Sequence, residues 1–275
     1  MKLTKMLPAI VTGLALTASS ALAGEDLDRI MENGVMKVST SLNWAPQSFL
    51  NEDNEMDGFD VSVAREIGKR MGVEVEFVTP DWSIITAGNW NDRWDVSIGS
   101  MTPTPQRAEV LDFPVIYYYT PGAFMVHEDS EAVSLSDLNG KKIGTVINST
   151  YESYLRKELV IDALGAPEFE FQVTPGEIVS MDTIGAVLDD LRLGNGIRLD
   201  AGITSLPGII SAQEAGYPIK ALEERPFYGP AAVAIDKGDP ELAAKLTEIV
   251  EEMRADGTLN ALSMEWYGVD LSVAD

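Results

Sequence analysis

Strand and helix signals alternate along this chain, and this alternation constrains the fold more than any other feature. Apolar residues recur at every second position in the strand segments and at helical spacing between them. Strands separated by helices predict a mostly parallel sheet that is covered by helices on both faces. In the first unit the expected strands are residues 35–40, 73–78 and 95–98, and the expected helix runs from 58 to Gly72.

The same alternation restarts near residue 138 and then returns to an earlier pattern. The second unit has expected strands at 143–147 and 199–203 and expected helices from about Thr150 and over 184–193. After it come an expected strand at 231–235 and an expected helix from 240 to about 255. Two α/β units predict two lobes, the second inserted in the first. We expect lobe 1 to comprise 24–119 and 225–275, and lobe 2 to comprise 120–224. A cleft between such lobes, at the carboxyl ends of strands, is the expected ligand site.

Two local features of the first unit carry further expectations. The segment 44–49 contains Pro46 and is expected to form an irregular loop. Asp60, which follows Gly58 at the start of the helix, is expected to be its N-cap.

The first 23 residues have the pattern of a cleaved secretory signal peptide. Lys2 and Lys5 precede an apolar run from Met6 to about Leu16, and an Ala-Leu-Ala triplet follows at 21–23. A transmembrane anchor is the alternative, but the run is short and contains Pro8. The rest of the chain has no run long enough to span a bilayer. We therefore expect a periplasmic protein without direct membrane insertion.

Charge and cysteine content exclude several function classes. The 275 residues carry a formal charge of −24, which would repel nucleic acid and anionic lipid. The chain has no cysteine, so it has no disulfide, no thiolate nucleophile and no thiolate metal site. We expect no nucleic-acid partner, no metal and no cofactor.

Several motifs, in the expected order over nearly the whole mature chain, resemble the family 3 extracellular solute-binding proteins. The matching stretches are Gly-Phe-Asp-Val at 58–61, Ser-Met-Thr-Pro-Thr-Pro-Gln-Arg-Ala at 100–108, Val-Leu-Asp-Phe at 110–113, Gly-Lys-Lys-Ile-Gly at 140–144, Ala-Asp-Gly-Thr at 255–258 and Trp-Tyr-Gly at 266–268. The resemblance implies a type II periplasmic-binding-protein fold, in which two hinge strands, here near 119 and 225, join lobes that close on a ligand. It also implies capture of a small carboxylate-bearing solute, a polar amino acid or a derivative, by a monomer that delivers it to an ABC-transporter permease in the inner membrane.

The lobe 1 site residues follow from this resemblance and from local chemistry. Thr104 and Pro105 look like the N-cap and first residue of a helix, which places Arg107 in its first turn. A guanidinium binds a carboxylate with two parallel hydrogen bonds, and the resemblance gives Arg107 this role. A surface arginine paired with Glu109 or Asp112 is the alternative. The resemblance also implies that Thr102 donates to the same carboxylate and that the carbonyl of Ser100, usually a glycine in the family, accepts from the ligand's amino group.

In lobe 2, residues 149–152 fit a capping box that opens a helix, with Ser149 as the N-cap. The resemblance implies that Thr150 and the neighbouring amides bind the ligand carboxylate from the second side; a capped helix without a ligand is the alternative. The resemblance also places the indoles of Trp44 and Trp82 above and below the ligand, with core packing as their alternative. Trp90 and Trp94 are assigned to packing.

Two departures from the family concern the ligand's ammonium group. Ser41 and Ser205 stand where relatives usually carry aspartates that pair with it. An unpaired ammonium in a buried pocket is unfavourable, so an N-substituted or quaternary amine, betaine-like or opine-like, is an alternative ligand. Asp182 is a candidate substitute acid that the sequence does not place.

Two other functions stay open. The resemblance extends to periplasmic enzymes of the cyclohexadienyl dehydratase kind, although the chain has no nucleophile, metal or phosphate-loop motif and we expect no catalytic residue. Its one histidine, His127, is expected to be solvated on the surface rather than a general base. Delivery to a chemoreceptor or sensor is the third reading.

Overall fold

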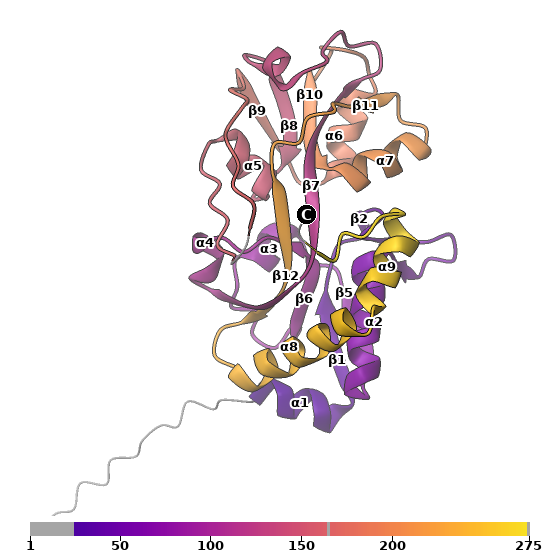
Figure 1. Cartoon of the computed structure of the whole chain (residues 1–275), viewed down its shortest axis with the longest axis vertical. Helices are drawn as coiled ribbons and strands as arrows, with labels where there is room; N and C mark the ends of the chain where they lie inside the picture. Colours follow the sequence, from indigo (N-terminus) through magenta and orange to yellow (C-terminus); the bar gives the residue numbers. More distant parts are fainter. Residues whose placement is uncertain (1–24, 164–165, 274–275) are drawn as a thin grey trace, which may run out of the picture.

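The computed structural model describes residues 25–163 and 166–273. The predicted signal peptide at 1–23 lies outside the described residues. We use lobe 1 and lobe 2 for the parts on either side of the predicted boundaries at 119/120 and 224/225. The two lobes are stacked along the long axis of the molecule, with β7 and β12 running between them (Figure 1).

Lobe 1 is built on the predicted strand–helix alternation. Residues 35–40, 73–78 and 95–98 are confirmed as strands with shifted ends, and Gly72 ends the first long helix in the left-handed conformation, with φ 76°. The elements of this lobe are α1 (Glu25–Asn33), β1 (Val35–Ser39), α2 (Phe59–Met71), β5 (Glu74–Val78), α3 (Trp82–Thr86), β6 (Val96–Met101), α4 (Pro105–Ala108), α8 (Pro240–Ala255) and α9 (Thr258–Tyr267).

Lobe 2 repeats the alternation on a smaller scale. Its predicted strands and helices are confirmed, and β9, α7 and β11 are additional elements. The elements are the 3₁₀ helix η1 (Leu135–Leu138), β8 (Lys142–Val146), α5 (Thr150–Leu155), β9 (Glu177–Met181), α6 (Ile184–Leu191), β10 (Ala201–Ser205), α7 (Leu206–Glu214) and β11 (Ile219–Ala221).

Two long strands connect the lobes. β7 (Leu111–His127) pairs with β12 (Tyr228–Asp236) over its first part and with β10 and β11 over its last part, all antiparallel. The sheet order is β5-β1-β6-β12-β7-β10-β8-β9, and β1 pairs in parallel with β5 and β6, as β8 does with β9 and β10. The predicted α/β class is therefore confirmed.

The segment that was expected to be an irregular loop forms a small sheet instead. β2 (Asn43–Trp44), β3 (Ser48–Leu50) and β4 (Met56–Asp57) pair antiparallel beside the main sheet. The prediction was wrong because Pro46 lies in the turn between β2 and β3, where its missing N–H interrupts no ladder.

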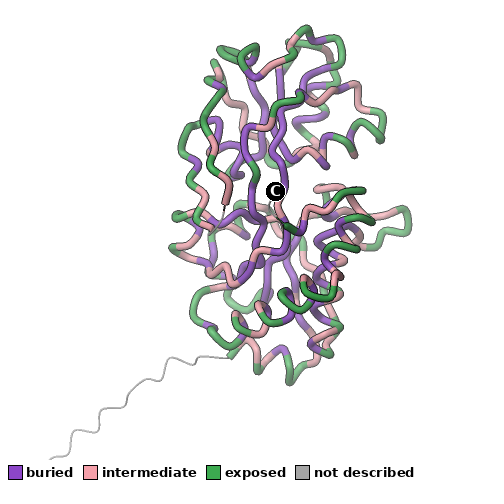
Figure 2. Tube along the Cα trace, viewed as in Figure 1, coloured by how far each residue is buried: buried purple, intermediate pink, exposed green. Residues whose placement is uncertain are grey.

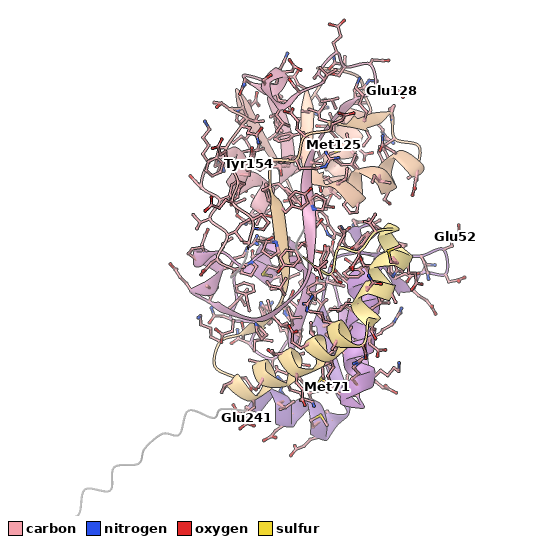
Figure 3. The ribbon with its side chains drawn as sticks, viewed as in Figure 1. Glu52, Met71, Met125, Glu128, Tyr154 and Glu241 are labelled. Carbon is pink, nitrogen blue, oxygen red and sulfur yellow. The ribbon has the colours of Figure 1, made fainter. Side chains whose placement is uncertain are left out.

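Buried residues follow the central strands, and exposed residues cover the outer helices and loops (Figure 2). The core falls into separate clusters. Met71 belongs to the largest one, in lobe 1, whereas Met125 and Tyr154 belong to two clusters of lobe 2 (Figure 3). Phe227 packs with Tyr151 and Tyr154, so the lobe 2 core extends a few residues past the predicted boundary. None of the helices in the described part is both long and apolar enough to cross a membrane.

Candidate ligand-binding site

A cavity of about 200 Å³ lies between the lobes, at the carboxyl ends of strands from both. Residues 79–82 follow β5, residues 149–151 follow β8 and residues 182–184 follow β9, and all of them line the cavity. This is the position that open α/β sheets offer to ligands. The structure brings eight of the nine predicted site residues to this cavity, namely Ser41, Trp44, Trp82, Ser100, Thr102, Arg107, Ser149 and Thr150.

Arg107 is held in place as its sequence context predicts. The Thr104 hydroxyl accepts from the Arg107 amide at 3.3 Å, and Pro105 is the first residue of α4. The residue is 7% exposed; its Nη1 donates to the Thr102 carbonyl and its Nη2 to the Asn148 carbonyl, each at 2.8 Å. Because Asn148 belongs to lobe 2, Arg107 touches both lobes.

The positive charge of Arg107 has no acidic partner in the part of the chain that the structure describes. The suggested surface partner Asp112 lies near Lys237 instead, at 3.3 Å. Burial lowers the pKa of the Arg107 guanidinium to about 10 because the dry surroundings disfavour its charge. A buried cation without a counter-charge is unfavourable, and an anionic ligand group in the cavity would relieve it.

Trp82 lies against the same guanidinium. The Arg107 Cζ is 5.4 Å from the centre of the Trp82 ring, within cation–π distance. The Trp82 Nε1 donates to the Asn148 carbonyl at 3.2 Å. Trp44 approaches Tyr151 of lobe 2 at 6.4 Å between ring centres, and its buried Nε1 has no hydrogen-bond partner among the described residues. Both indoles line the cavity, whereas Trp90 and Trp94 are packed in the core as predicted.

The start of α5 follows its prediction only in part. Ser149 is the N-cap and its Oγ accepts from the Glu152 amide at 3.1 Å. The Glu152 carboxylate does not complete a capping box, because it accepts from the Asn148 amide at 2.6 Å rather than from Ser149. Asn148 has φ 57°, a conformation that is unfavourable for most residues, and the hydrogen bond from its amide to Glu152 stabilises it there. In this conformation its carbonyl accepts from Arg107.

The two serines at the family's aspartate positions have different surroundings. Ser41 lines the cavity, and its Oγ accepts from the Asn43 amide at 3.3 Å. Ser205 is buried and is absent from the lining: it caps α7 by accepting from the Gly208 amide at 3.2 Å, and its hydroxyl is 3.1 Å from the Gln47 amide group. The expectation that Ser205 faces the ligand is therefore not met by the structure.

Asp60 and His127 differ from their predictions. Asp60 does not cap α2, whose N-cap is Gly58 without a side-chain bond; it is fully buried and accepts from Ser100 Oγ and Tyr117 Oη, each at 2.8 Å. His127 is buried at the end of β7, with its Nδ1 accepting from the Asp129 amide at 3.2 Å, so its predicted solvation was wrong. His127 is not part of the cavity lining.

Sequence reasoning missed several cavity residues. Asp81 directly precedes Trp82 after a strand end, a signal that would have found it, and Asp182, which the sequence did not place, lines the cavity from lobe 2. Thr120 of β7 also lines it, with a buried hydroxyl that has no partner among the described residues. Within the described ranges no group of three or more acidic or histidine side chains is arranged to hold a metal ion.

This arrangement defines a class of protein: two α/β lobes with a type II periplasmic-binding-protein fold and a cavity between them that is lined by a buried arginine. Residues 36–269 match the profile of the bacterial extracellular solute-binding proteins, family 3, and the chain belongs to that family.

Curated relatives and solved structures agree with this family. The chain is 27% identical over 267 residues to a probable amino-acid ABC transporter-binding protein of Haemophilus influenzae, covering 96% of each chain. It is 27% identical to the L-cystine-binding protein TcyJ of Escherichia coli, covering 97% of this chain and 94% of that one. An ancestral arginine-binding protein bound to glutamine superposes with a TM-score of 0.73 at 29% identity, covering 86% of this chain and 98% of the other. An ancestral amino acid-binding protein described as a precursor of cyclohexadienyl dehydratase superposes with a TM-score of 0.74 at 26% identity. The match covers 88% of this chain and 99% of the other.

Proposed function

We propose that this solute-binding protein captures an α-amino acid with a polar or positively charged side chain, and that Arg107 binds its carboxylate. The observation that carries the proposal is the buried guanidinium, which lines the cavity without an acidic partner among the described residues. A carboxylate in the cavity supplies that partner through two charge-assisted hydrogen bonds. Thr102 and Thr150 line the cavity beside it from the two lobes and complete the donors for this group.

The preference for a polar or cationic side chain comes from the other lining residues. Asp81 in lobe 1 and Asp182 in lobe 2 bring negative charge to the cavity, and Trp44 and Trp82 bring flat aromatic surface. Carboxylates together with indole faces complement a cation such as a guanidinium. The curated relatives include proteins named for arginine and for cystine, which are amino acids of this kind.

The ammonium group distinguishes this ligand from the substituted amines. Ser41 offers only a neutral oxygen on the cavity wall, so a free α-ammonium needs negative charge from another residue. A quaternary amine between Trp44 and Trp82 is the competing ligand, because Trp44 presents an aromatic surface that needs no ammonium hydrogen bond.

Transport rather than catalysis is the role that these features support. Relatives are named as binding proteins of ABC transporters, and the one histidine lies outside the cavity. We infer that the mature chain is a periplasmic monomer whose lobes, divided near 119 and 225, close on the ligand and present it to an inner-membrane permease. Incubation of the protein with its ligand tests this role, and we expect the ligand to be recovered intact. A product that forms in proportion to the protein concentration would favour the dehydratase-like alternative.

Calorimetry with a panel of pure compounds tests the ligand class. The panel is L-arginine, L-glutamine, L-cystine, glycine betaine and agmatine, which is arginine without its carboxylate. A ligand at 100 times its dissociation constant stabilises the protein by roughly 2.7 kcal/mol, so thermal shifts first identify binders. We expect L-arginine to bind and agmatine to fail. Equal binding of agmatine and arginine would show that Arg107 does not hold a carboxylate, and binding of betaine alone would favour the substituted amine.

A further inference from the structure

A buried carboxylate lies directly behind the cavity wall. Asp60 is in the first turn of α2 with no exposed surface, and its Oδ2 accepts from Ser100 Oγ at 2.8 Å. Ser100 itself lines the cavity, two residues before Thr102, whose carbonyl binds Arg107. Asp60 is therefore one hydrogen bond away from a residue of the cavity wall.

Ser100 has a backbone conformation that a serine rarely adopts. Its φ is 57°, in the left-handed region that favours glycine. Three hydrogen bonds hold it there: its amide donates to Tyr117 Oη at 2.8 Å, and its Oγ contacts both Asp60 and Tyr118 Oη, the latter at 2.6 Å. Because its amide and its hydroxyl are both engaged inside lobe 1, neither of them is free to bind a ligand in the cavity.

The groups around Asp60 leave its charge without compensation. Ser100 faces it from β6, Tyr117 and Tyr118 from β7, and Tyr267 from α9, and burial raises the pKa of all three tyrosines well above the usual range, so they are neutral. α8 and β12 contribute apolar side chains such as Leu246 and Val233 to the core cluster that contains Tyr117 and Tyr118. Asp60 makes no salt bridge with any described residue. Desolvation raises its pKa to about 7.

We propose that Asp60 is the positioning residue of an ammonium subsite: it holds Ser100 so that its carbonyl faces the cavity, and it supplies the negative charge against which the ligand's α-ammonium binds. This inference rests on the proposed amino-acid function. An α-amino acid carries its ammonium on the carbon next to the carboxylate, so a ligand held by Arg107 places that ammonium near Ser100. The carboxylate behind Ser100 replaces the charge that Ser41 and Ser205 lack.

The proposal requires that binding and ionisation of Asp60 be coupled. A cation near Asp60 favours its ionised form, so the ligand lowers the pKa of Asp60 and its binding releases a proton near neutral pH. Affinity for an α-amino acid should then rise as the pH rises through about 7. A ligand without the α-ammonium should show no such dependence.

The test compares L-arginine with 5-guanidinopentanoic acid, which keeps the carboxylate and guanidinium but lacks the α-ammonium. Calorimetry on the wild type should show arginine binding about tenfold tighter at about pH 8 than at about pH 5.5, the factor that corresponds to one pKa unit. Asp60→Asn should bind arginine about tenfold more weakly at pH 8 with a flat profile. Both proteins should bind the des-amino compound alike at every pH.

A matched control separates this effect from the loss of any buried carboxylate. Asp239 is also buried in lobe 1 and accepts from the Leu242 amide at 2.8 Å, but it is not part of the cavity lining. Asp239→Asn should keep the wild-type arginine profile. In the wild type, a carboxyl carbon NMR signal that titrates near 7 should move to lower pH with arginine but not with the des-amino compound, a result that needs no folded variant.

The outcomes separate the two proposals. If arginine and the des-amino compound bind equally at all pH values, or if Asp60→Asn keeps the pH profile of the wild type, the Asp60 inference is overturned and carboxylate capture by Arg107 stands. If neither compound binds, the proposed function fails and the inference falls with it.

Discussion

Replacing Arg107 by methionine separates stability from binding. Methionine keeps much of the length of the side chain and removes its charge and its donors. The fall in the Arg107 pKa from its usual value to about 10 corresponds to about 3 kcal/mol of unfavourable burial in the folded protein. Against this, the variant loses the two hydrogen bonds to the Thr102 and Asn148 carbonyls, worth about 1 kcal/mol each.

These opposing contributions predict that Arg107→Met is as stable as the wild type or up to about 2 kcal/mol more stable without ligand. The sign holds at neutral pH, because Arg107 is charged below its folded pKa of about 10 and its destabilising effect fades only above that value. Binding of L-arginine should weaken by roughly 2–5 kcal/mol, as for truncation of a buried charge pair. The same change would then raise stability and remove function.

Urea denaturation without ligand and calorimetry with L-arginine measure the two effects. The control is Arg70→Met: Arg70 is 2.9 Å from Glu66 and 2.7 Å from Asp256, so its loss should lower the free energy of unfolding. Breaking a buried ion pair lowers the free energy of unfolding by about 3 kcal/mol or more. A decrease of that size in Arg107→Met would refute the view that Arg107 lacks a counter-charge. Retained arginine affinity would refute its role in binding.

Three further predictions concern the cavity and its surroundings. Trp82→Ala should weaken L-arginine binding by roughly 1–3 kcal/mol in calorimetry, since it removes the indole face beside Arg107; unchanged affinity would assign Trp82 to packing alone. Asp182→Asn should weaken binding of L-arginine more than of L-glutamine, and equal losses for both would place Asp182 away from the ligand side chain. In the unliganded protein, burial raises the pKa of Asp60 from 3.8 to about 7. The stability that protonated Asp60 contributes is therefore present in acid and is lost as the pH rises toward 7, by up to about 4 kcal/mol. Asp60→Asn should lack this loss in urea denaturation, and parallel curves of unfolding free energy against pH for the two proteins would contradict the prediction.

Local sequence signals predicted the parts of the fold and the site that depend on local chemistry. Gly72 ends α2 in the left-handed conformation, and Thr104 with Pro105 begins α4, because helix ends are set by residues within one turn. Parallel strands end at one edge of a sheet, so residues after those ends were expected to meet. The family resemblance selected the nine candidate residues, and the cavity lining contains eight of them.

Long-range partners decided the cases that sequence reasoning missed. Asp60 has the residue type and position of an N-cap, but its actual partners are Ser100 and Tyr117, 40 and 57 residues away. Ser205 was assigned to the site because it aligns with an aspartate position of the family, whereas its hydroxyl caps α7 and contacts Gln47, 158 residues away. The charged residues that follow His127 suggested exposure, but β11 pairs with β7 at His127, and the residue is buried.

Arg107 and Asp60 together make the strongest physical case for a zwitterionic ligand. Each is a buried charge in lobe 1 that has no opposite charge paired with it among the described residues, and each has a pKa shifted by burial toward its neutral form. Selection for stability alone would favour pairing such charges or replacing them by apolar side chains. Arg107 lines the cavity and Asp60 lies one residue behind it, so an α-amino acid in that cavity would bring a carboxylate to one and an ammonium to the other. The two unfavourable burials would then become favourable only when the ligand is bound, which makes ligand charge the property that this site selects.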